Sequence, residues 1–343
     1  MSIKPKVSVI MSVYNGEKYV KEAIESVLAQ SFKEFEFIII DDGSTDSSVA
    51  TVTGYDDKRI RFLKNDKNRG LAYSLNQGIE EANGKYIARM DSDDICLENR
   101  LELQYNYMEA HPDIGISGAA AKVFGNESRP LKYPGDPEEL KILLLYHSPL
   151  IHPTVIFRTD IFRQNKNLRY QEDPPTAEDY DMWEKASYVV KIGNLPECVL
   201  LYRVDHEIKI PKYLSEQNQG NLDVKRRILR KLLSRDVSDD ELQTHIDFSQ
   251  VRIIGKTDDL MNIFKWAEIL LQANFNQKIY DQSKFENQIL EKFYIILTQS
   301  ECVKFRKLKW FIQLKIKHKK TTKYGFALKL LIKVILNKKI SQE

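Results

Sequence analysis

Three acidic clusters in the sequence contain the residue types that bind a polar substrate, hold a cation or accept a proton. They are residues 41–46 (DDGSTD), 91–94 (DSDD) and 178–183 (EDYDMW). The first two each follow directly after an apolar, β-rich run, and the third opens an amphipathic stretch. Acidic clusters are also typical of solvated turns and helix caps, so each needs its own argument.

The DSDD cluster has the spacing of a cation site. Two carboxylates separated by one residue at a strand end can converge on one hard ion, and Mn²⁺ or Mg²⁺ prefers such oxygen ligands. Asp93 and Asp91 are the predicted metal ligands, with Asp94 as an alternative that the sequence does not separate from them. The bound ion would neutralise a departing diphosphate. The D-x-D pattern also arises by chance in surface loops.

The first cluster suits the recognition of a nucleoside. Its carboxylates repel phosphate but can accept hydrogen bonds from a base N–H or a ribose hydroxyl. Gly43 allows the tight turn that would bring Asp41 and Asp42 to a ligand. The alternative is a solvated turn in which Ser44 or Asp46 caps the following helix.

The third cluster contains a predicted proton acceptor. Asp179 would act as general base on an acceptor hydroxyl, with Glu178 beside it as a candidate acceptor or phosphate contact. Trp183 offers an apolar face to a sugar ring, although filling the core is the interpretation that we favour. Carboxylates at a helix start are also stabilised by the macrodipole, so simple N-terminal capping stays open.

The elements that must position these clusters alternate between strand and helix. Apolar runs predict strands at 7–13, 35–40, 60–63 and 86–90, and helical spacing predicts helices at 17–29 and 73–82. The run at 35–40 (FEFIII) is nearly continuous, as in a strand buried on both faces of a parallel sheet. This order favours an α/β fold with an open parallel sheet, which binds ligands at the carboxyl ends of its strands.

The remainder of the chain changes character near residue 210. Nine of the eleven prolines lie between residues 101 and 203, where short helices and strands are expected. Long helical patterns follow at 223–233, 258–273 and 285–297. We therefore predict a catalytic domain at 1–210 and a helical extension at 211–343.

Cysteine usage and apolar runs limit the class of protein further. The three cysteines form no C-x-x-C pattern, which argues against a disulfide framework and a structural zinc site and favours a cytoplasmic setting. No run of about 18 apolar residues occurs, so no transmembrane helix is predicted.

Taken together, these motifs resemble those of the family 2 glycosyltransferases, which have the GT-A nucleotide-sugar-binding fold. The matching segments, within residues 7–203, are VSVIMSVYNGEKYVKEAIESVLAQSF, FIIIDDGSTD, NRGLAYSLNQGIEEANGKYIARMDSDD, HPTVIFR, AEDYDMW and LLYR. The resemblance implies an inverting, metal-dependent transferase that moves a sugar from a nucleotide-diphosphate sugar to an acceptor hydroxyl. It implies nucleoside binding by Asp41, Asp42 and Asp91, cation binding by Asp91 and Asp93, and catalysis by the base Asp179.

Two departures from the family pattern concern the acceptor and phosphate contacts. Where many relatives have a Gly-Gly-Tyr-like segment, this chain has NKNLRYQEDPPTAEDY. His206 follows the Tyr202–Arg203 pair one position later than in many relatives and is a candidate phosphate or metal contact. His152, a lone histidine before a proline, is interpreted as structural.

Two other functions compete with glycosyl transfer. A sugar-1-phosphate nucleotidyltransferase also uses an α/β fold and a metal, but the expected Gly-rich, Arg-containing loop does not follow the first strand. A nucleotide-sugar-binding protein without turnover is the second alternative, and the presence of both Asp179 and the D-x-D pattern argues against it.

The C-terminal tail is strongly basic. Residues 304–343 carry a net charge of +12, which leaves −9 on the rest of a chain whose total is +3. A helix over residues 326–340 would be amphipathic, and at about 1.5 Å per residue it is too short to span a bilayer core of about 30 Å. The tail either packs on the enzyme or lies on an anionic membrane surface.

The resemblance also sets the expected partners. A UDP-sugar is the expected donor and a saccharide, lipid-linked in one alternative, is the expected acceptor, while nucleic acid is not expected. The setting that it implies is the assembly of a bacterial surface polysaccharide, in the cytoplasm or at the inner face of the plasma membrane.

Overall fold

The structure is a computed structural model that describes residues 4–172, 177–204, 211–251 and 257–299. The chain divides into two compact units, Met1–Leu140 with His147–Asn221, and Lys141–Tyr146 with Leu222–Glu343. Within the described ranges, no helix is both long and apolar enough to cross a membrane.

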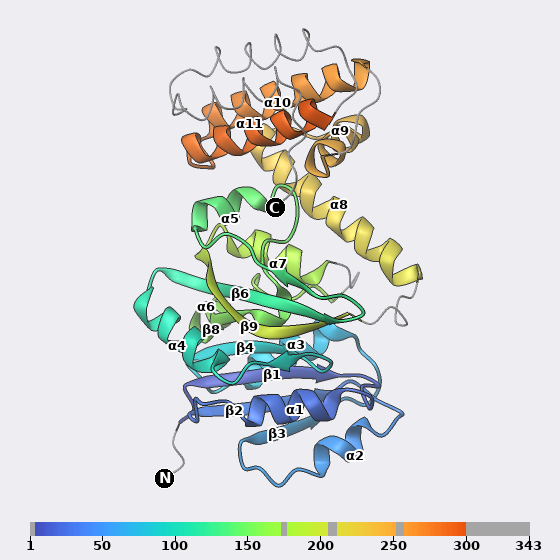
Figure 1. Cartoon of the computed structure of the whole chain (residues 1–343), viewed down its shortest axis with the longest axis vertical. Helices are drawn as coiled ribbons and strands as arrows, with labels where there is room; N and C mark the ends of the chain where they lie inside the picture. The colour runs from blue at the N-terminus through green and yellow to red at the C-terminus, as the bar shows by residue number, and fades with distance from the viewer. Residues whose placement is uncertain (1–3, 173–176, 205–210, 252–256, 300–343) are drawn as a thin grey trace. The chain divides into compact units, whose positions relative to one another are not determined.

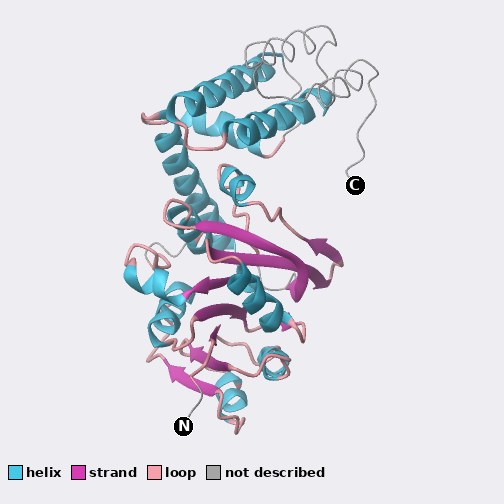
Figure 2. Cartoon of the chain, turned by 90° about the vertical axis from the view of Figure 1, so that its left-hand side faces the viewer, coloured by secondary structure: helices cyan, strands magenta, loops and turns pink. Residues whose placement is uncertain are grey.

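The first unit is built on a sheet with helices on both of its faces, as Figure 1 and Figure 2 show. Its strand order over the described residues is β3-β2-β1-β4-β8-β6-β9-β5, and β7 pairs with β6. The strands are β1 (Val7–Val13), β2 (Phe35–Asp41), β3 (Ile60–Lys64), β4 (Tyr86–Asp91), β5 (Ile95–Cys96), β6 (Ile114–Gly125), β7 (Arg129–Leu131), β8 (Ile156–Arg158) and β9 (Lys191–Val204).

The N-terminal half of this sheet is parallel. Strands β3, β2, β1 and β4 pair side by side in the same direction. Parallel neighbours need a crossover, which helices α1 (Val20–Leu28), α2 (Ser48–Thr53) and α3 (Leu71–Glu81) supply. In Figure 1, α1 and α2 lie in front of the sheet and α3 behind it. The predicted α/β fold with a mostly parallel sheet is confirmed.

The other half of the sheet mixes directions. Strand β8 runs antiparallel to both β4 and β6, β6 runs parallel to β9, and β5 runs antiparallel to β9. The short elements that accompany these strands are α4 (Arg100–Ala110), α5 (Pro137–Leu143), the 3₁₀ turn η1 (His152–Thr154), α6 (Thr159–Gln164) and α7 (Glu178–Ala186).

The core of the first unit lies under the parallel strands. Every residue of β2 is buried, in agreement with its continuous apolar run. On α1 the buried residues are Val20, Ala23, Ile24 and Val27, which recur at helical spacing and cover the sheet. Each fully buried aliphatic side chain contributes about 1.5–3 kcal/mol, so this face fixes the strands that carry the acidic clusters.

The second unit is helical, as predicted for the C-terminal region. Its helices are α8 (Pro211–Leu233), which begins in the first unit, α9 (Asp239–Ser249), α10 (Thr257–Gln277) and α11 (Gln282–Gln299). The buried His245 ties them to the segment Lys141–Tyr146, because it donates to the Leu145 carbonyl at 2.7 Å and accepts from the Trp266 indole at 3.2 Å. The basic tail lies outside the described residues.

Candidate active site

The first two acidic clusters lie at the same edge of the sheet because β1 separates the strands that carry them. Val13 pairs with Asp41 at the end of β2, and Ser12 pairs with Asp91 at the end of β4. The three strands are parallel, so their carboxyl ends coincide. The edge at which ligand binding was predicted therefore carries both clusters.

Asp42 is fully engaged with the loop between β3 and α3. Its carboxylate accepts hydrogen bonds from the Asn65 side-chain amide at 2.7 Å and from the backbone N–H groups of Arg69 at 3.0 Å and Gly70 at 2.8 Å. The Asp42 side chain is only 2% exposed. Three charge-assisted bonds of this kind hold the loop against the end of β2.

One carboxylate oxygen of Asp41 has no hydrogen-bond partner among the described residues, whereas both oxygens of Asp42 accept hydrogen bonds. Oδ1 of Asp41 accepts the backbone N–H of Ser44 at 3.2 Å, but its buried Oδ2 has no partner among the described residues. Buried polar atoms seldom lack a partner, so Oδ2 is the oxygen of this cluster that is available to a ligand. The turn depends on Gly43, whose φ is 77° and whose added Cβ would lie 2.6 Å from the Lys67 carbonyl carbon.

Asp46 joins two loops, whereas one interpretation of the sequence made it the cap of the following helix, whose N-cap is Ser47. The Asp46 carboxylate accepts the backbone N–H of Glu17 and that of Ser48, both at 2.9 Å. Asn15, which has a φ of 49°, adds a second link through its amide oxygen to the N–H of Thr45 at 2.9 Å. These bonds join the loop after β1 to the loop after β2.

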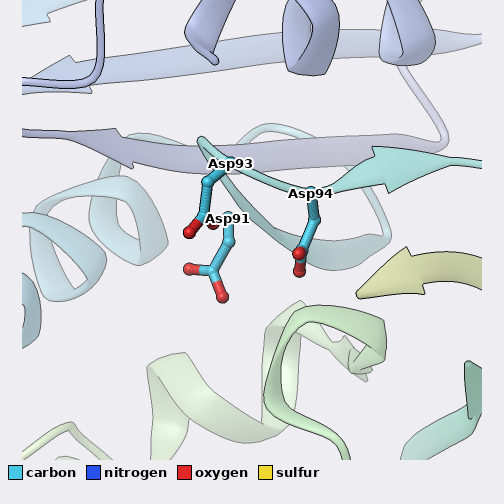
Figure 3. Close-up of side chains that lie close together, drawn as sticks. All are labelled: Asp91, Asp93 and Asp94. Carbon is cyan, nitrogen blue, oxygen red and sulfur yellow. The ribbon is translucent and has the colours of Figure 1, made fainter. Parts of the chain in front are cut away.

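The DSDD cluster converges as the cation hypothesis requires. Asp91, Asp93 and Asp94 each offer a carboxylate oxygen within 4.8 Å of the others, and Figure 3 shows the three side chains gathered around one space. Burial, followed by the charge of Asp91, raises the pKa of Asp93 to about 6 and that of Asp94 to about 8.

Asp94 also has an unused acceptor. Its Oδ1 accepts the backbone N–H of Arg203 at 2.8 Å, whereas its buried Oδ2 has no partner among the described residues. Three close carboxylates, two with raised pKa values and one with an orphan oxygen, are a donor set that fits a hard divalent cation.

Asp91 is paired with a buried arginine on its own strand. Nη1 of Arg89 donates to Oδ2 of Asp91 at 2.6 Å, and Nη2 contacts Oδ1. The Arg89 side chain is only 2% exposed. Sequence reasoning missed Arg89, although a charged residue inside the apolar run YIARM is the signal that could have found it.

The third cluster begins α7 with an unusual backbone. Ala177, the residue before the helix, is in the left-handed region with a φ of 54°. Oδ2 of Asp179 accepts the Ser148 hydroxyl at 3.1 Å. Burial raises the pKa of Asp179, against hydrogen bonds from the Tyr180 backbone and from Ser148. Burial and then the charge of Asp179 raise the pKa of Glu178 to about 7.

The second and third clusters share one electrostatic environment. The positive charge of Arg89 lowers the pKa of Glu178 and that of Asp179, and the negative charge of Asp91 raises that of Glu178. Such effects on a pKa are largest between groups that lie a few ångströms apart. The start of α7 therefore faces the end of β4.

Trp183 fills the core behind this site. Its side chain is fully buried and packs edge-on against the rings of His152 and Tyr170, with centroids 5.9 and 6.4 Å away. His152 Nε2 lies 3.0 Å from the Tyr170 hydroxyl oxygen, and burial holds the pKa of His152 well below its ordinary value. This packing agrees with a structural role for Trp183 and His152. His206 lies outside the described residues.

Sequence comparison identifies the family. The sequence model described as Glycosyl transferase family 2 matches residues 8–165. The O-antigen biosynthesis glycosyltransferase WbnJ of Escherichia coli is 32% identical over 216 residues, which cover 60% of this chain and 83% of that protein. The chain belongs to glycosyltransferase family 2, as the motifs indicated.

Solved structures support the same fold. Staphylococcus aureus TarS 1–349 in complex with UDP-GlcNAc has a TM-score of 0.55 at 20% identity, over 91% of this chain and 89% of that one. The mannosyltransferase PcManGT from Pyrobaculum calidifontis, in complex with GDP-Man and Mn²⁺, has a TM-score of 0.51 at 14% identity, over 98% of this chain and 89% of that one. The fold is that of the GT-A glycosyltransferases.

Proposed function

We propose that this enzyme transfers a sugar from a nucleotide-diphosphate sugar to an acceptor hydroxyl in one in-line displacement that inverts the anomeric configuration. The observation that carries the proposal is the meeting of two kinds of carboxylate at one sheet edge. Asp91, Asp93 and Asp94 lie together as candidate cation ligands, and the start of α7 brings the buried Asp179 and its neighbour Glu178, whose pKa is raised by burial and also by the charge of Asp91, to the same site.

The nucleoside of the donor would be bound by the first cluster. Oδ2 of Asp41 is the acceptor there without a partner among the described residues, so it is the atom expected to meet a base N–H or ribose hydroxyl. Asp42 contributes by holding the neighbouring loop. A UDP-sugar is the expected donor, because TarS has been crystallised with UDP-GlcNAc.

The cation would be held by Asp93 and Asp94, with Asp91 as the third ligand. Arg89 occupies one direction on each oxygen of Asp91, and a carboxylate oxygen has a second lone pair to offer. A bound Mn²⁺ or Mg²⁺ would neutralise the diphosphate as it leaves. The Mn²⁺ in the PcManGT complex supports this choice of ion.

Asp179 would accept the proton of the attacking hydroxyl. Its burial raises its pKa, which makes the carboxylate a stronger base at neutral pH. The Ser148 hydroxyl, which donates to Oδ2 at 3.1 Å, helps to fix the orientation of this carboxylate. The charge of Asp179 contributes to the raised pKa of Glu178, so the protonation of these two neighbouring carboxylates is linked.

The expected setting is the assembly of a bacterial surface polysaccharide, since WbnJ acts in O-antigen biosynthesis. The acceptor would then be a growing saccharide, and an attached lipid would hold it at the inner face of the plasma membrane. The basic tail would bring the enzyme to the same surface.

A donor screen tests the proposed reaction. The protein is incubated with Mn²⁺ and each of a panel of UDP- and GDP-sugars, and the nucleotide released is measured with and without EDTA. We expect nucleoside diphosphate from one donor, dependent on Mn²⁺ and lost in Asp93→Ala. Release of pyrophosphate from a nucleoside triphosphate would favour the nucleotidyltransferase instead. Retention of the donor's anomeric configuration, read by NMR, would contradict the single displacement.

A further inference from the structure

Arg203 stands where β9 passes the turn that carries the candidate cation ligands. Strands β5 and β9 pair Ile95 with Leu201 and Cys96 with Leu200, and this antiparallel register, if continued, would place Arg203 opposite Asp93. The regular ladder does not continue. The backbone N–H of Arg203 turns to the Asp94 carboxylate at 2.8 Å, and the side-chain Nε donates to the Asp93 carbonyl at 2.7 Å.

The guanidinium of Arg203 also contacts a carboxylate on α1 and two aromatic rings. Its Nη2 donates to Oε2 of Glu22 on α1 at 2.6 Å. Its Cζ lies 4.0 Å from the centroid of the Tyr19 ring and 4.4 Å from that of the Phe124 ring. The side chain is 13% exposed, so it is held almost entirely by protein contacts. Such a guanidinium has little freedom left to lose when a ligand binds.

The hydrogen bonds from Arg203 counteract the repulsion between the carboxylates of the acidic turn. Three carboxylates within 4.8 Å repel one another when they are ionised, so contacts that hold the main chain of the turn favour the converged arrangement. Arg203 donates hydrogen bonds to two consecutive residues of the turn. Its Nε binds the main-chain carbonyl of Asp93, and its backbone N–H binds the side chain of Asp94. It leaves Oδ2 of Asp94 free of a partner among the described residues.

We propose that Arg203 is a positioning residue that preorganises the Asp93–Asp94 turn for the cation. The inference rests on the proposed cation site and names a residue outside the three acidic clusters. Arg203 need not touch the ion, because residues behind the ligands typically change metal affinity by about 10- to 100-fold through ligand orientation alone.

The test is a Mn²⁺ titration of the full-length protein, with and without UDP, followed by the electron paramagnetic resonance signal of the free ion. Arg203→Met removes the Nε bond and the guanidinium's ring contacts but keeps the backbone N–H to Asp94. We expect it to weaken Mn²⁺ binding by about 10- to 100-fold, and Arg203→Lys to weaken it less. At saturating Mn²⁺, kcat should recover most of its wild-type value.

Two control variants separate positioning from general stability. Arg61→Met removes bonds to Glu36 and Glu81 around β3, so it should lower the melting temperature and leave Mn²⁺ affinity unchanged. Glu22→Gln removes only the outer ion pair of Arg203 and should also leave Mn²⁺ affinity nearly unchanged. If Arg61→Met weakens Mn²⁺ binding as much as Arg203→Met does, the effect is one of stability and the inference fails.

The outcome also distinguishes this inference from the proposed function. If the wild-type protein binds Mn²⁺ and both Arg203 variants bind it equally well, the positioning role is wrong and the cation site stands. If the wild-type protein binds no Mn²⁺ even with UDP, the cation site itself is wrong and the role of Arg203 falls with it. Should Arg203→Met fail to fold, Arg203→Lys alone decides between these results.

Discussion

Asp41 and Asp42 are neighbours with the same predicted role, but their contacts predict opposite results for the same substitution. In Asp42→Asn, one oxygen becomes an NH₂ group, which must face either the Gly70 N–H or the donors from Asn65 and Arg69. In Asp41→Asn, Oδ1 can keep its backbone bond while the NH₂ group replaces an oxygen that has no partner among the described residues.

The structure allows the cost of each substitution to be worked out. A buried donor that faces another donor costs about 1–3 kcal/mol, and loss of the charge weakens the two other bonds to Asp42. The Gly70 N–H also reaches Oδ1 of Asn68 at 3.0 Å, which offsets part of this cost. We expect Asp42→Asn to lower the free energy of unfolding by about 2–3 kcal/mol and the melting temperature by about 4–12 °C. Asp41→Asn should change the free energy by less than about 1 kcal/mol.

The affinity for UDP should be lowered more by Asp41→Asn than by Asp42→Asn. Hydrogen bonds to a charged group contribute about 1.5–3 kcal/mol, so Asp41→Asn should weaken UDP binding by about 10- to 150-fold. The assays are thermal melts and calorimetric titration with UDP in Mn²⁺. Asp66→Asn, an exposed carboxylate on the loop that Asp42 holds, is the matched control and should change neither quantity. The reasoning is refuted if Asp41→Asn melts as low as Asp42→Asn or binds UDP as tightly as the wild type.

Three further predictions concern the base and the tail. Asp179→Asn should lower the transfer rate by about 10²- to 10⁴-fold while calorimetry shows unchanged UDP binding, and a wild-type rate would exclude Asp179 as the base. The wild-type rate should fall on acidification at a higher pH than an ordinary aspartate would give, because the base must be unprotonated and burial raises the pKa of Asp179; a pH–rate profile that falls only near the ordinary aspartate pKa would contradict this. Full-length protein should co-sediment with anionic vesicles at low salt and a chain truncated after Glu301 should not, whereas equal binding by both would show that the tail is not the anchor.

The parallel half of the sheet was predictable because each of its elements carries a local signal. The strands predicted at 35–40 and 86–90 occur as β2 and β4, each one residue longer. Alternation of these runs with helical periodicity determines the parallel order, and the order determines that both acidic clusters share an edge. The position of these clusters was therefore accessible from the sequence, although the different contacts of Asp41 and Asp42 were not.

The remaining half depends on contacts between distant residues, which periodicity does not encode. Strand β8 has only three residues, yet it joins β4 to β6. Ser148 meets Asp179 across 31 positions, and Arg203 meets Asp93 across 110. Ser148 stands in no local pattern that distinguishes it from other polar residues, and Arg203 was recognised only as part of the LLYR segment, which does not indicate its contact with Asp93. The residues that orient the carboxylates were accordingly missed, while the carboxylates themselves were found.

Because Arg89 is paired with Asp91, substitutions at Asp91 and Asp93 differ in how well they test the candidate cation site. It lies on β4, where pairing changes from parallel with β1 to antiparallel with β8, and its guanidinium is buried against Asp91. Removing the Asp91 carboxylate would leave a buried arginine unpaired, at a cost of about 3–5 kcal/mol. Activity would then fall whether or not a cation binds. Asp93 forms no ion pair among the described residues, so removal of its carboxylate leaves the Arg89–Asp91 pair intact and disturbs stability less. Whether the enzyme depends on a metal should therefore be judged from a substitution at Asp93 and not from one at Asp91.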